Sequence, residues 1–159
     1  MKLKTKNGET IYIDTVDADL ATLTWYINSN GYVKRHKERV NGKNIHEYLH
    51  TVILERKLGR KLLVDEECDH RNLHSLNNRR NNLRLSTRSY NRANRVKYRG
   101  VSKYKGVSKD KRQNRWRATI SVNKKQIWLG GYVEEIDAAR AYDKAAIKYF
   151  GPFARINGV

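Results

Sequence analysis

The sequence contains a single cysteine, Cys68, among its 159 residues. One cysteine cannot form an internal disulfide or a cysteine-based zinc knuckle, so the chain needs no oxidising compartment. No apolar run reaches the length that crosses a membrane, and the N-terminal MKLKTKNGET lacks the apolar core of a signal peptide. We therefore expect an intracellular protein with no membrane partner.

Acidic residues are missing from the centre of the chain. Residues 70–109 contain twelve arginine and lysine residues and no aspartate or glutamate, and the whole chain has a formal net charge of +18. A solvated surface normally mixes both signs of charge, whereas a surface that follows a phosphate backbone avoids acids. The charge therefore predicts a nucleic-acid partner.

The N-terminal third predicts short strands in a small module. A chain of this length holds one ordinary domain or two small ones, neither with a large core. Residues 9–16 predict a strand because Ile11 and Ile13 fall on one face. Residues 24–28 and 31–36 predict a hairpin, since Ser29-Asn30-Gly31 between them is typical of a turn.

A helix is expected from Ile45 to Leu58. Its apolar residues recur at helical spacing, Asn44 with Glu47 resembles a capping box, and Gly59 suits the C-terminal end. The helix is expected to pack behind the stretch that follows it.

Residues 68–95, CDHRNLHSLNNRRNNLRLSTRSYNRANR, combine an Asp-His pair, spaced asparagines and many arginines. They predict a strand at 64–69, a loop, a returning strand at 81–85 and a helix at 87–95 with Ser86 as its N-cap. Hydrolysis of a phosphodiester needs a base that deprotonates water and a hard cation that stabilises the leaving oxygen. A neutral histidine can be that base, and aspartate and asparagine oxygens suit Mg²⁺ or Mn²⁺. The stretch therefore predicts the active site of a DNA-cutting enzyme.

At these residues the chain resembles the HNH homing endonucleases of the HNN type, whose ββα-metal fold presents an Asp-His pair on a hairpin and an asparagine on the next helix. The matching elements are DH at 69–70, NNRRNNLRL at 77–85 and RSYNRANR at 88–95. The resemblance implies that Asp69 and Asn91 bind one divalent cation, Mg²⁺ or Mn²⁺, and that His70 activates water. It also implies that Asn82 orients His70 or braces the hairpin. Asn94 competes with Asn91 as a metal ligand.

These residues have two other interpretations. An Asn- and Arg-rich segment can be only a DNA-binding surface, but Asp69 is the one acid in that surrounding and has no obvious value for binding DNA. His46 and His50 lie four apart on the expected helix, a spacing that can bind a metal. No third ligand lies at a recognisable distance, so a structural role is favoured for both, with His50 supporting the site from behind.

Three arginines of the expected second helix form a stripe. Arg88, Arg92 and Arg95 lie at positions i, i+4 and i+7, so they share one helix face that can follow a phosphate backbone.

The C-terminal part begins with a tandem repeat at residues 98–109, YRGVSK then YKGVSK, which leaves the domain boundary open by one repeat. Two strands around an NKK turn and an alanine-rich helix follow. Strand alternation separates two faces. The apolar face holds Trp116, Ala118, Ile120, Val122, Ile127 and Leu129. The polar face holds Arg115, Arg117, Thr119, Ser121, Gln126 and Trp128.

The apolar face is expected to pack on the helix, leaving the polar face for a DNA major groove. The inner helix stripe is expected to be Ala138, Ala141, Tyr142, Ala145 and Tyr149. Trp128 could instead be a core aromatic, but its strand parity argues for contact with a ligand.

This segment closely resembles the Apetala-type DNA-binding domain of plant ethylene-response transcription factors, a domain also found fused to phage-type HNH nucleases. The matching residues are YKGVS at 104–108, RWRATI at 115–120, WLGGY at 128–132, AARAYDKAAIKYFG at 138–151 and Asn157. The resemblance implies that seven residues contact DNA: Lys105, Ser108, Arg117, Thr119, Ser121, Gln126 and Trp128.

The sequence thus predicts an α+β protein, with a small ββα-metal nuclease domain at 1–95, a basic linker at 96–103 and an Apetala-type domain at 104–159. That domain is expected to be a three-stranded antiparallel sheet packed on one helix. The expected function is site-preferring cleavage of double-stranded DNA, by nicking or by double-strand cutting, as a monomer or a DNA-assembled dimer. A bacterial or phage-infected cytoplasm is the expected location. The alternatives are a DNA-binding regulator with a vestigial nuclease site and, more weakly, an RNA-binding protein.

Overall fold

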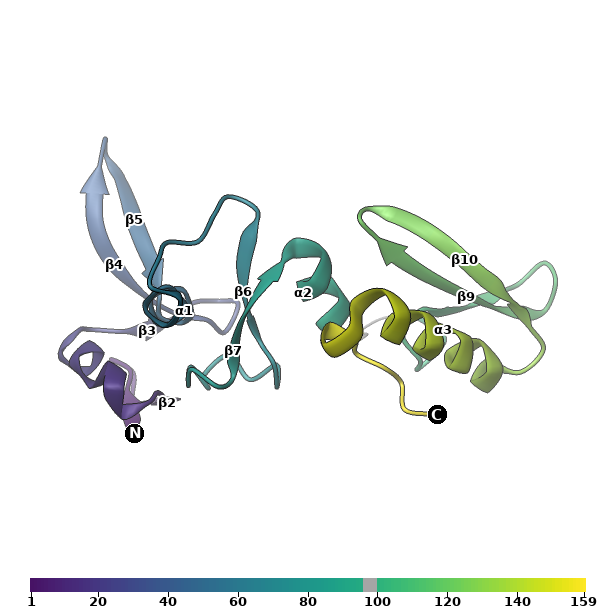
Figure 1. Ribbon diagram of the computed structural model, residues 1–159, viewed down its shortest axis with the longest axis horizontal. Coiled ribbons are helices and arrows are strands. Elements are labelled where there is room, and N and C mark those ends of the chain that lie inside the picture. The colour runs from purple at the N-terminus through teal and green to yellow at the C-terminus, as the bar shows by residue number, and fades with distance from the viewer. Residues whose placement is uncertain (96–99) are drawn as a thin grey trace. The chain divides into compact units, whose positions relative to one another are not determined.

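The computed structural model describes residues 1–95 and 100–159. Contacts among the described residues divide the chain into an N-terminal unit, Met1–Thr87, and a C-terminal unit, Arg88–Val159. Each unit combines small antiparallel sheets with helices (Figure 1), so the expected mixture of α and β structure is confirmed. The expected basic linker at 96–103 lies partly outside the described residues.

The N-terminal unit contains three small antiparallel sheets. Its strands are β1 (Lys2–Lys4), β2 (Thr10–Tyr12), β3 (Tyr26–Ile27), β4 (Val33–Val40), β5 (Lys43–Tyr48), β6 (Glu66–His70) and β7 (Leu83–Thr87). β1 pairs with β2, β3–β4–β5 form one sheet in that order, and β6 pairs with β7. A 3-10 segment, η1 (Thr15–Thr22), precedes β3, and α1 (Leu49–Leu58) lies between β5 and β6.

One apolar cluster connects these elements, with members from β1 to β7: Leu3, Ile11, Ile13, Leu20, Trp25, Val33, Leu49, Ile53, Leu54 and Leu83. The expected strand at 9–16 is confirmed only for Thr10–Tyr12, because Thr15 and Val16 already belong to η1, and the expected hairpin at 24–36 is confirmed in outline. Ile11 and Ile13 are both fully buried, and Gly31 takes the positive φ of +79° that its turn requires.

The expected start of the helix at Ile45 is wrong. Residues Lys43–Tyr48 form strand β5, which is hydrogen-bonded to β4, and α1 begins only at Leu49. The capping box is absent, because the Asn44 side chain accepts a hydrogen bond from His36 across the hairpin. The pairing of these residues with β4 therefore overrides their local helical pattern. His46 lies on β5, so it does not share a helix with His50. The C-terminal end is confirmed, since Gly59 follows the helix in the left-handed conformation.

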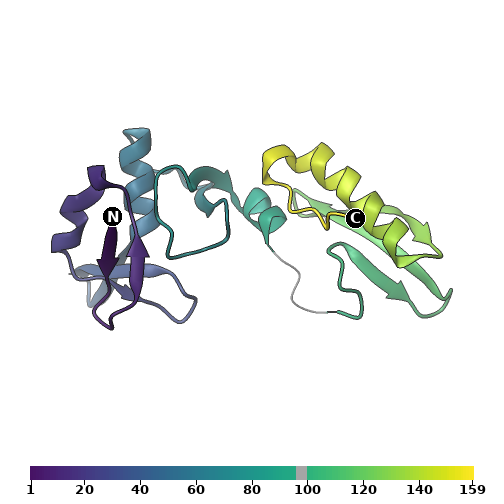
Figure 2. The same ribbon diagram turned by 90° about the horizontal axis from the view of Figure 1, so that it is seen from below.

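The C-terminal unit is a three-stranded antiparallel sheet packed on a helix. Its elements are α2 (Arg88–Asn94), β8 (Val107–Asp110), β9 (Arg115–Val122), β10 (Lys125–Tyr132), α3 (Glu135–Phe150) and the 3-10 turn η2 (Gly151–Phe153). The strands lie in the order β10–β9–β8. Figure 2 shows α3 lying along one side of this sheet.

Small residues allow this helix to approach the sheet closely. Ala118 of β9 and Ala138, Ala139 and Ala146 of α3 are fully buried, and a Cβ on Gly106 would lie 1.8 Å from the Tyr142 ring. Tyr149 was expected on the inner stripe and is instead exposed. Its neighbour Phe150 is buried, because it follows Tyr142 and Ala146 at intervals of four residues on the same helix face.

In the two described ranges, no helix has the combined length and apolarity that a membrane crossing requires.

Candidate active site

The Asp-His pair lies at the end of β6, where the hairpin with β7 opens into the loop at residues 71–82. Asp69 pairs in register with Arg84, and His70 with Leu83. Side chains alternate along a strand, so Asp69 and His70 point to opposite faces of the hairpin. Both side chains are buried.

Asn82 closes the base of this loop. Its side-chain oxygen accepts a hydrogen bond from the Asn72 backbone N–H at 3.1 Å, and its side-chain nitrogen donates to the Asn77 carbonyl at 2.7 Å. The Asn82 backbone carbonyl also accepts from the Arg71 N–H. Asn82 thus connects both arms of the loop directly beside His70.

Asn78 is a site residue that the sequence reasoning did not single out. It is fully buried, and its Oδ1 lies 3.2 Å from His70 Nε2. The Asn78 amide nitrogen donates to the Ser75 carbonyl, and its backbone N–H donates to the Tyr12 carbonyl on β2. Because Oδ1 can only accept, His70 Nε2 carries the proton and Nδ1 carries the lone pair. Its only signal in the sequence is the pair of asparagines at 77–78, which begins the NNRRNNLRL stretch.

A cluster of aromatic rings surrounds His70 on the N-terminal unit. Its ring centroid lies 5.2 Å from that of His50 and 6.2 Å from that of Tyr32. His50 is the second residue of α1, and it stacks on Tyr48 at 5.4 Å. Burial and then the neighbouring His70 lower the pKa of His50 to about 3. Burial also lowers the pKa of His70, although the Asn78 hydrogen bond and the Asp69 charge act in the opposite direction.

Asp69 forms a buried ion pair with Arg84, its partner across the hairpin. The Asp69 Oδ2 accepts a hydrogen bond from Arg84 Nε at 2.7 Å and forms an ion pair with Arg84 Nη2 at the same distance. A carboxylate is the hard oxygen donor that Mg²⁺ and Mn²⁺ prefer, but here its charge is already neutralised by a guanidinium. Within residues 1–95 and 100–159, no group of three or more His, Cys, Asp or Glu side chains could hold a metal ion. A cation would therefore need asparagine oxygens in addition to Asp69.

The remaining expected residues of the site lie on α2. Asn91 is half-buried and Asn94 is buried, while Arg88, Arg92 and Arg95 are exposed along the helix and just beyond it. The contacts of α2 assign it to the C-terminal unit, whereas Asp69, His70 and Asn82 belong to the N-terminal unit.

The outer face of the β8–β9–β10 sheet carries most of the expected DNA contacts. Ser108 lies opposite Arg117, Thr119 opposite Trp128, and Ser121 opposite Gln126, so these six side chains form three cross-strand pairs. Thr119 is half-buried, and the other five are exposed. The Trp128 side chain is 60% exposed, so its expected place outside the core is confirmed. Arg117 pairs with Asp110 at 2.9 Å.

Lys105 is held by the backbone of its own unit. Its ammonium donates to the carbonyls of Ala93 and Arg95 at the C-terminal end of α2. Burial and the nearby Arg155 charge lower the pKa of Lys105 to about 8. A DNA contact by this side chain would have to replace those hydrogen bonds.

Comparison with known proteins places both parts of the chain. A family model for HNH endonucleases matches residues 47–93, and one for AP2 domains matches residues 102–152. An uncharacterized HNH endonuclease of Acanthamoeba polyphaga mimivirus, L560, is 30% identical over 138 residues, which cover 85% of this chain and 67% of the viral protein.

Plant transcription factors match shorter stretches of the chain. APETALA2-like protein 2 of Oryza sativa subsp. japonica is 48% identical over 71 residues, or 45% of this chain and 15% of the plant protein. Ethylene-responsive transcription factor WRI1 of Arabidopsis thaliana is 46% identical over 61 residues, or 37% of this chain and 14% of that protein. The chain therefore spans only a small part of the plant relatives.

These matches define the class as an HNH endonuclease family chain with a second domain of the AP2 type. The chain belongs to the HNH endonucleases and contains an AP2 domain, so both resemblances seen in the sequence are confirmed.

Proposed function

We propose that this chain is a site-preferring DNA endonuclease of the homing type, with His70 as general base and one divalent cation. The supporting observation is the buried His70, whose Nε2 proton is directed to Asn78 Oδ1 at the end of the strand that also carries Asp69. Because burial lowers the pKa of His70, the ring is neutral near pH 7 and can accept a proton.

In the proposed reaction, a water oxygen attacks the phosphorus while His70 Nδ1 takes the water proton. The bond from phosphorus to the 3′ oxygen breaks, and the products are a 5′-phosphate and a 3′-hydroxyl that takes up a proton. Asp69 and Asn91, or Asn94 in place of Asn91, would hold Mg²⁺ or Mn²⁺, whose charge stabilises the leaving oxygen when the ion is bound. The hydrogen bonds of Asn82 keep the loop closed, so that Asn78 stays beside His70.

We further propose a division of work between residues 1–95, which cut, and residues 104–159, which select the site, with 96–103 as a basic linker. Arg88, Arg92 and Arg95 contact the phosphate backbone. Base-edge contacts come from the outer sheet face: Ser108, Arg117, Thr119, Ser121, Gln126 and Trp128, with Lys105 beside it. One active site per chain nicks one strand, and cutting of both strands requires a dimer assembled on the DNA.

The test is incubation of supercoiled plasmid with the purified chain, with and without Mg²⁺ or Mn²⁺. The wild type is expected to relax or linearise the plasmid only with a metal ion. His70→Ala should slow cutting by about 10²–10⁴-fold while duplex affinity stays unchanged, because a general base acts only during the reaction.

The matched control for this test is His74→Ala, which removes an exposed histidine from the same loop. It is expected to cut like the wild type. A His70→Ala variant with wild-type turnover would show that His70 is not the base.

The second candidate function is a DNA-binding regulator with a vestigial nuclease site. The ion pair between Asp69 and Arg84 favours it, because the guanidinium contacts Oδ2 of the carboxylate that a cation needs. This function predicts that the chain binds duplex DNA tightly but does not cleave it with Mg²⁺ or Mn²⁺. The plasmid for this test carries a sequence that was first selected for binding to the same chain.

A further inference from the structure

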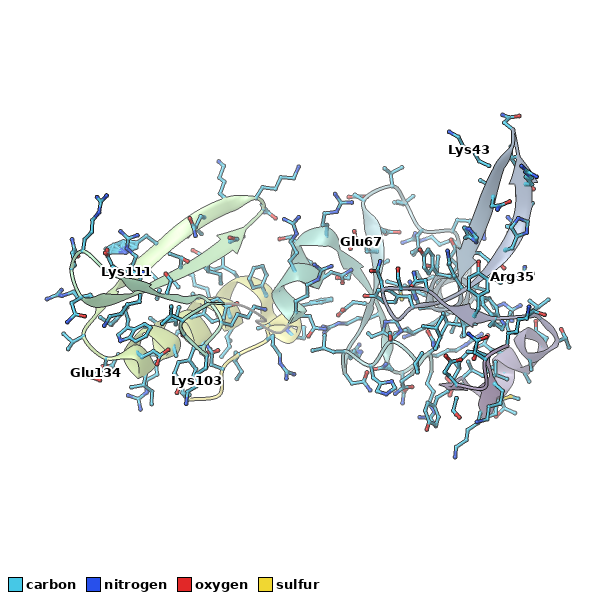
Figure 3. All side chains as sticks on the ribbon, turned by 180° about the vertical axis from the view of Figure 1, so that it is seen from behind. Arg35, Lys43, Glu67, Lys103, Lys111 and Glu134 are labelled. Atoms are coloured by element: carbon cyan, nitrogen blue, oxygen red, sulfur yellow. The ribbon has the colours of Figure 1, made fainter. Side chains whose placement is uncertain are left out.

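The β4–β5 hairpin extends well beyond the core of its unit. Of its residues, only Val33 at its base is fully buried, and residues 36–46 are all exposed. Figure 3 labels Lys43 beside the free end of the hairpin and Arg35 nearer its base. A two-stranded ribbon without an apolar face gains little stability from itself. An exposed ribbon of this length therefore needs an explanation other than the core.

The two faces of the ribbon differ in charge. One face, which we call the acid-free face, holds Tyr26, Lys34, His36, Arg39, Asn44 and His46. Cross-strand contacts define it: the Tyr26 hydroxyl lies 2.9 Å from His46 Nδ1, Lys34 lies over the Tyr26 ring, and His36 hydrogen-bonds to Asn44. Arg39 lies directly opposite Asn44.

Both acids of the ribbon lie on the opposite face, which we call the mixed face. Glu47 pairs with Arg35, and Glu38 pairs with Lys37. Glu38 also lies opposite Ile45, whose strand neighbours Asn44 and His46 belong to the acid-free face, so alternation places Glu38 away from that face. The separation of acids from one face indicates a polyanionic partner for that face.

We propose that the acid-free face binds the major groove of double-stranded DNA, as a contact additional to the AP2 sheet. This inference rests on the proposed nuclease function, which makes duplex DNA the substrate. A two-stranded ribbon fits the major groove, where arginine pairs with guanine and asparagine with adenine. The deep, narrow major groove of an RNA duplex does not admit such a ribbon.

The position of the ribbon relates it to the site of cutting. At its base, Tyr48 stacks on His50, and His50 contacts His70. From Tyr48 to the turn the strand spans about 20 Å, from roughly 3.3 Å per residue. This length corresponds to about six base pairs at 3.4 Å each. The ribbon therefore contacts DNA to one side of the phosphodiester bond whose hydrolysis is proposed for His70.

The test compares two double variants of the full chain that remove the same charge from the same hairpin. Lys34→Gln with Arg39→Gln alters the acid-free face, and Lys37→Gln with Lys43→Gln alters the mixed face. Affinity for a random-sequence DNA duplex is measured in EDTA over a salt series, with an RNA duplex as a second probe. Thermal melting verifies that both variants are folded.

The acid-free variant is expected to bind the DNA duplex at least tenfold more weakly than the mixed-face variant. The slope of log K against log salt concentration should also fall by about two, one for each lost phosphate contact. Its affinity for the RNA duplex should match that of the mixed-face variant. Equal losses in both variants, or a larger loss on RNA, would overturn the proposal.

The outcome is separable from that of the nuclease assay, because binding in EDTA needs no cleavage. If the chain never cuts plasmid but the acid-free variant alone loses DNA affinity, the nuclease function is contradicted and the inference about the ribbon is supported. If the chain cuts plasmid while both double variants bind DNA with equal affinity, only the inference about the ribbon is contradicted.

Discussion

At the scale of single residues, His70 is held by groups that come from different parts of the N-terminal unit. Asn78 fixes its tautomer, His50 and Tyr32 cover its ring, and Asp69 precedes it on β6. None of these contacts lets water surround the imidazole, so burial is the main influence on its pKa. The neutral form needed for a general base thus follows from packing.

His50 makes the stability of the chain depend on pH. Its folded pKa of about 3 lies below the value of about 6.5 for an unfolded histidine. Between these values the unfolded chain binds a proton that the folded chain does not. The contribution of His50 to stability is therefore complete above pH 6.5 and falls as the pH drops toward 3, by at most about 1.4 kcal/mol per pH unit.

Replacing His50 by Phe keeps a ring in the cluster and removes this titration. Urea unfolding over a pH series should show a shallower loss of stability below pH 6.5 than in the wild type. The exposed His36→Phe is the control, and its pH dependence should match the wild type. The same pH dependence in His50→Phe as in the wild type would show that His50 is protonated freely in the folded chain.

At the scale of elements, α2 packs as part of the C-terminal unit although it follows β7 directly. Tyr90 packs on Phe153 at 4.8 Å and on Phe150 at 6.1 Å between ring centroids. Ala93 is part of the apolar cluster that includes Phe150, and its carbonyl accepts hydrogen bonds from Lys105 and from the Arg155 N–H. This helix is thus stabilised by residues far along the chain.

We expect Tyr90→Ala to lower the free energy of unfolding of the C-terminal unit by about 1–2 kcal/mol, because it removes two aromatic contacts from a partly exposed ring. Tyr149→Ala is the matched control: Tyr149 is 37% exposed, close to the 36% of Tyr90, but it lies on the outer side of α3. Its effect should stay below about 0.5 kcal/mol. Calorimetry of both variants measures the loss of unfolding free energy. Equal losses in the two variants would contradict the role of α2 in that core.

At the scale of the whole molecule, the charge is unevenly divided between the two units. Residues 88–159 contain 18 of the 34 basic residues but only 5 of the 16 acids. In the proposed function, the C-terminal unit therefore provides most of the attraction to a phosphate backbone, and the N-terminal unit carries His70, the proposed general base. This distribution agrees with the proposal that the C-terminal unit selects the DNA site and that the N-terminal unit has the weaker sequence preference.

Arg117→Ala or Trp128→Ala should weaken binding to a selected duplex by about 1–3 kcal/mol, since both side chains are exposed on the outer sheet face. Arg140→Ala removes the same charge from the outer surface of α3 and serves as the control. Electrophoretic mobility shifts at fixed salt measure all three. If both sheet variants still cut at the same DNA site as the wild type, the sheet would not be the part that selects the site.

The sequence by itself determined the two-part organisation, the candidate residues Asp69 and His70, and the outward position of Trp128. These depend on local patterns, namely alternation along a strand and short motifs that the chain presents wherever it folds. Trp128 could be placed from parity alone, because a strand in a two-layer unit has one covered face.

Tertiary structure alone decided the start of α1, the contact between Asn78 and His70, the ion pair of Asp69 with Arg84 and the packing of α2. Ile45 continues the helical apolar spacing of residues 49–58, yet residues 43–48 pair with β4, and this pairing satisfies their backbone groups. Asn78 could not be distinguished from the other asparagines of its motif, since its role follows from the β2 carbonyl that holds it. Each of these contacts joins residues that the chain brings together only on folding, so no local pattern encodes it.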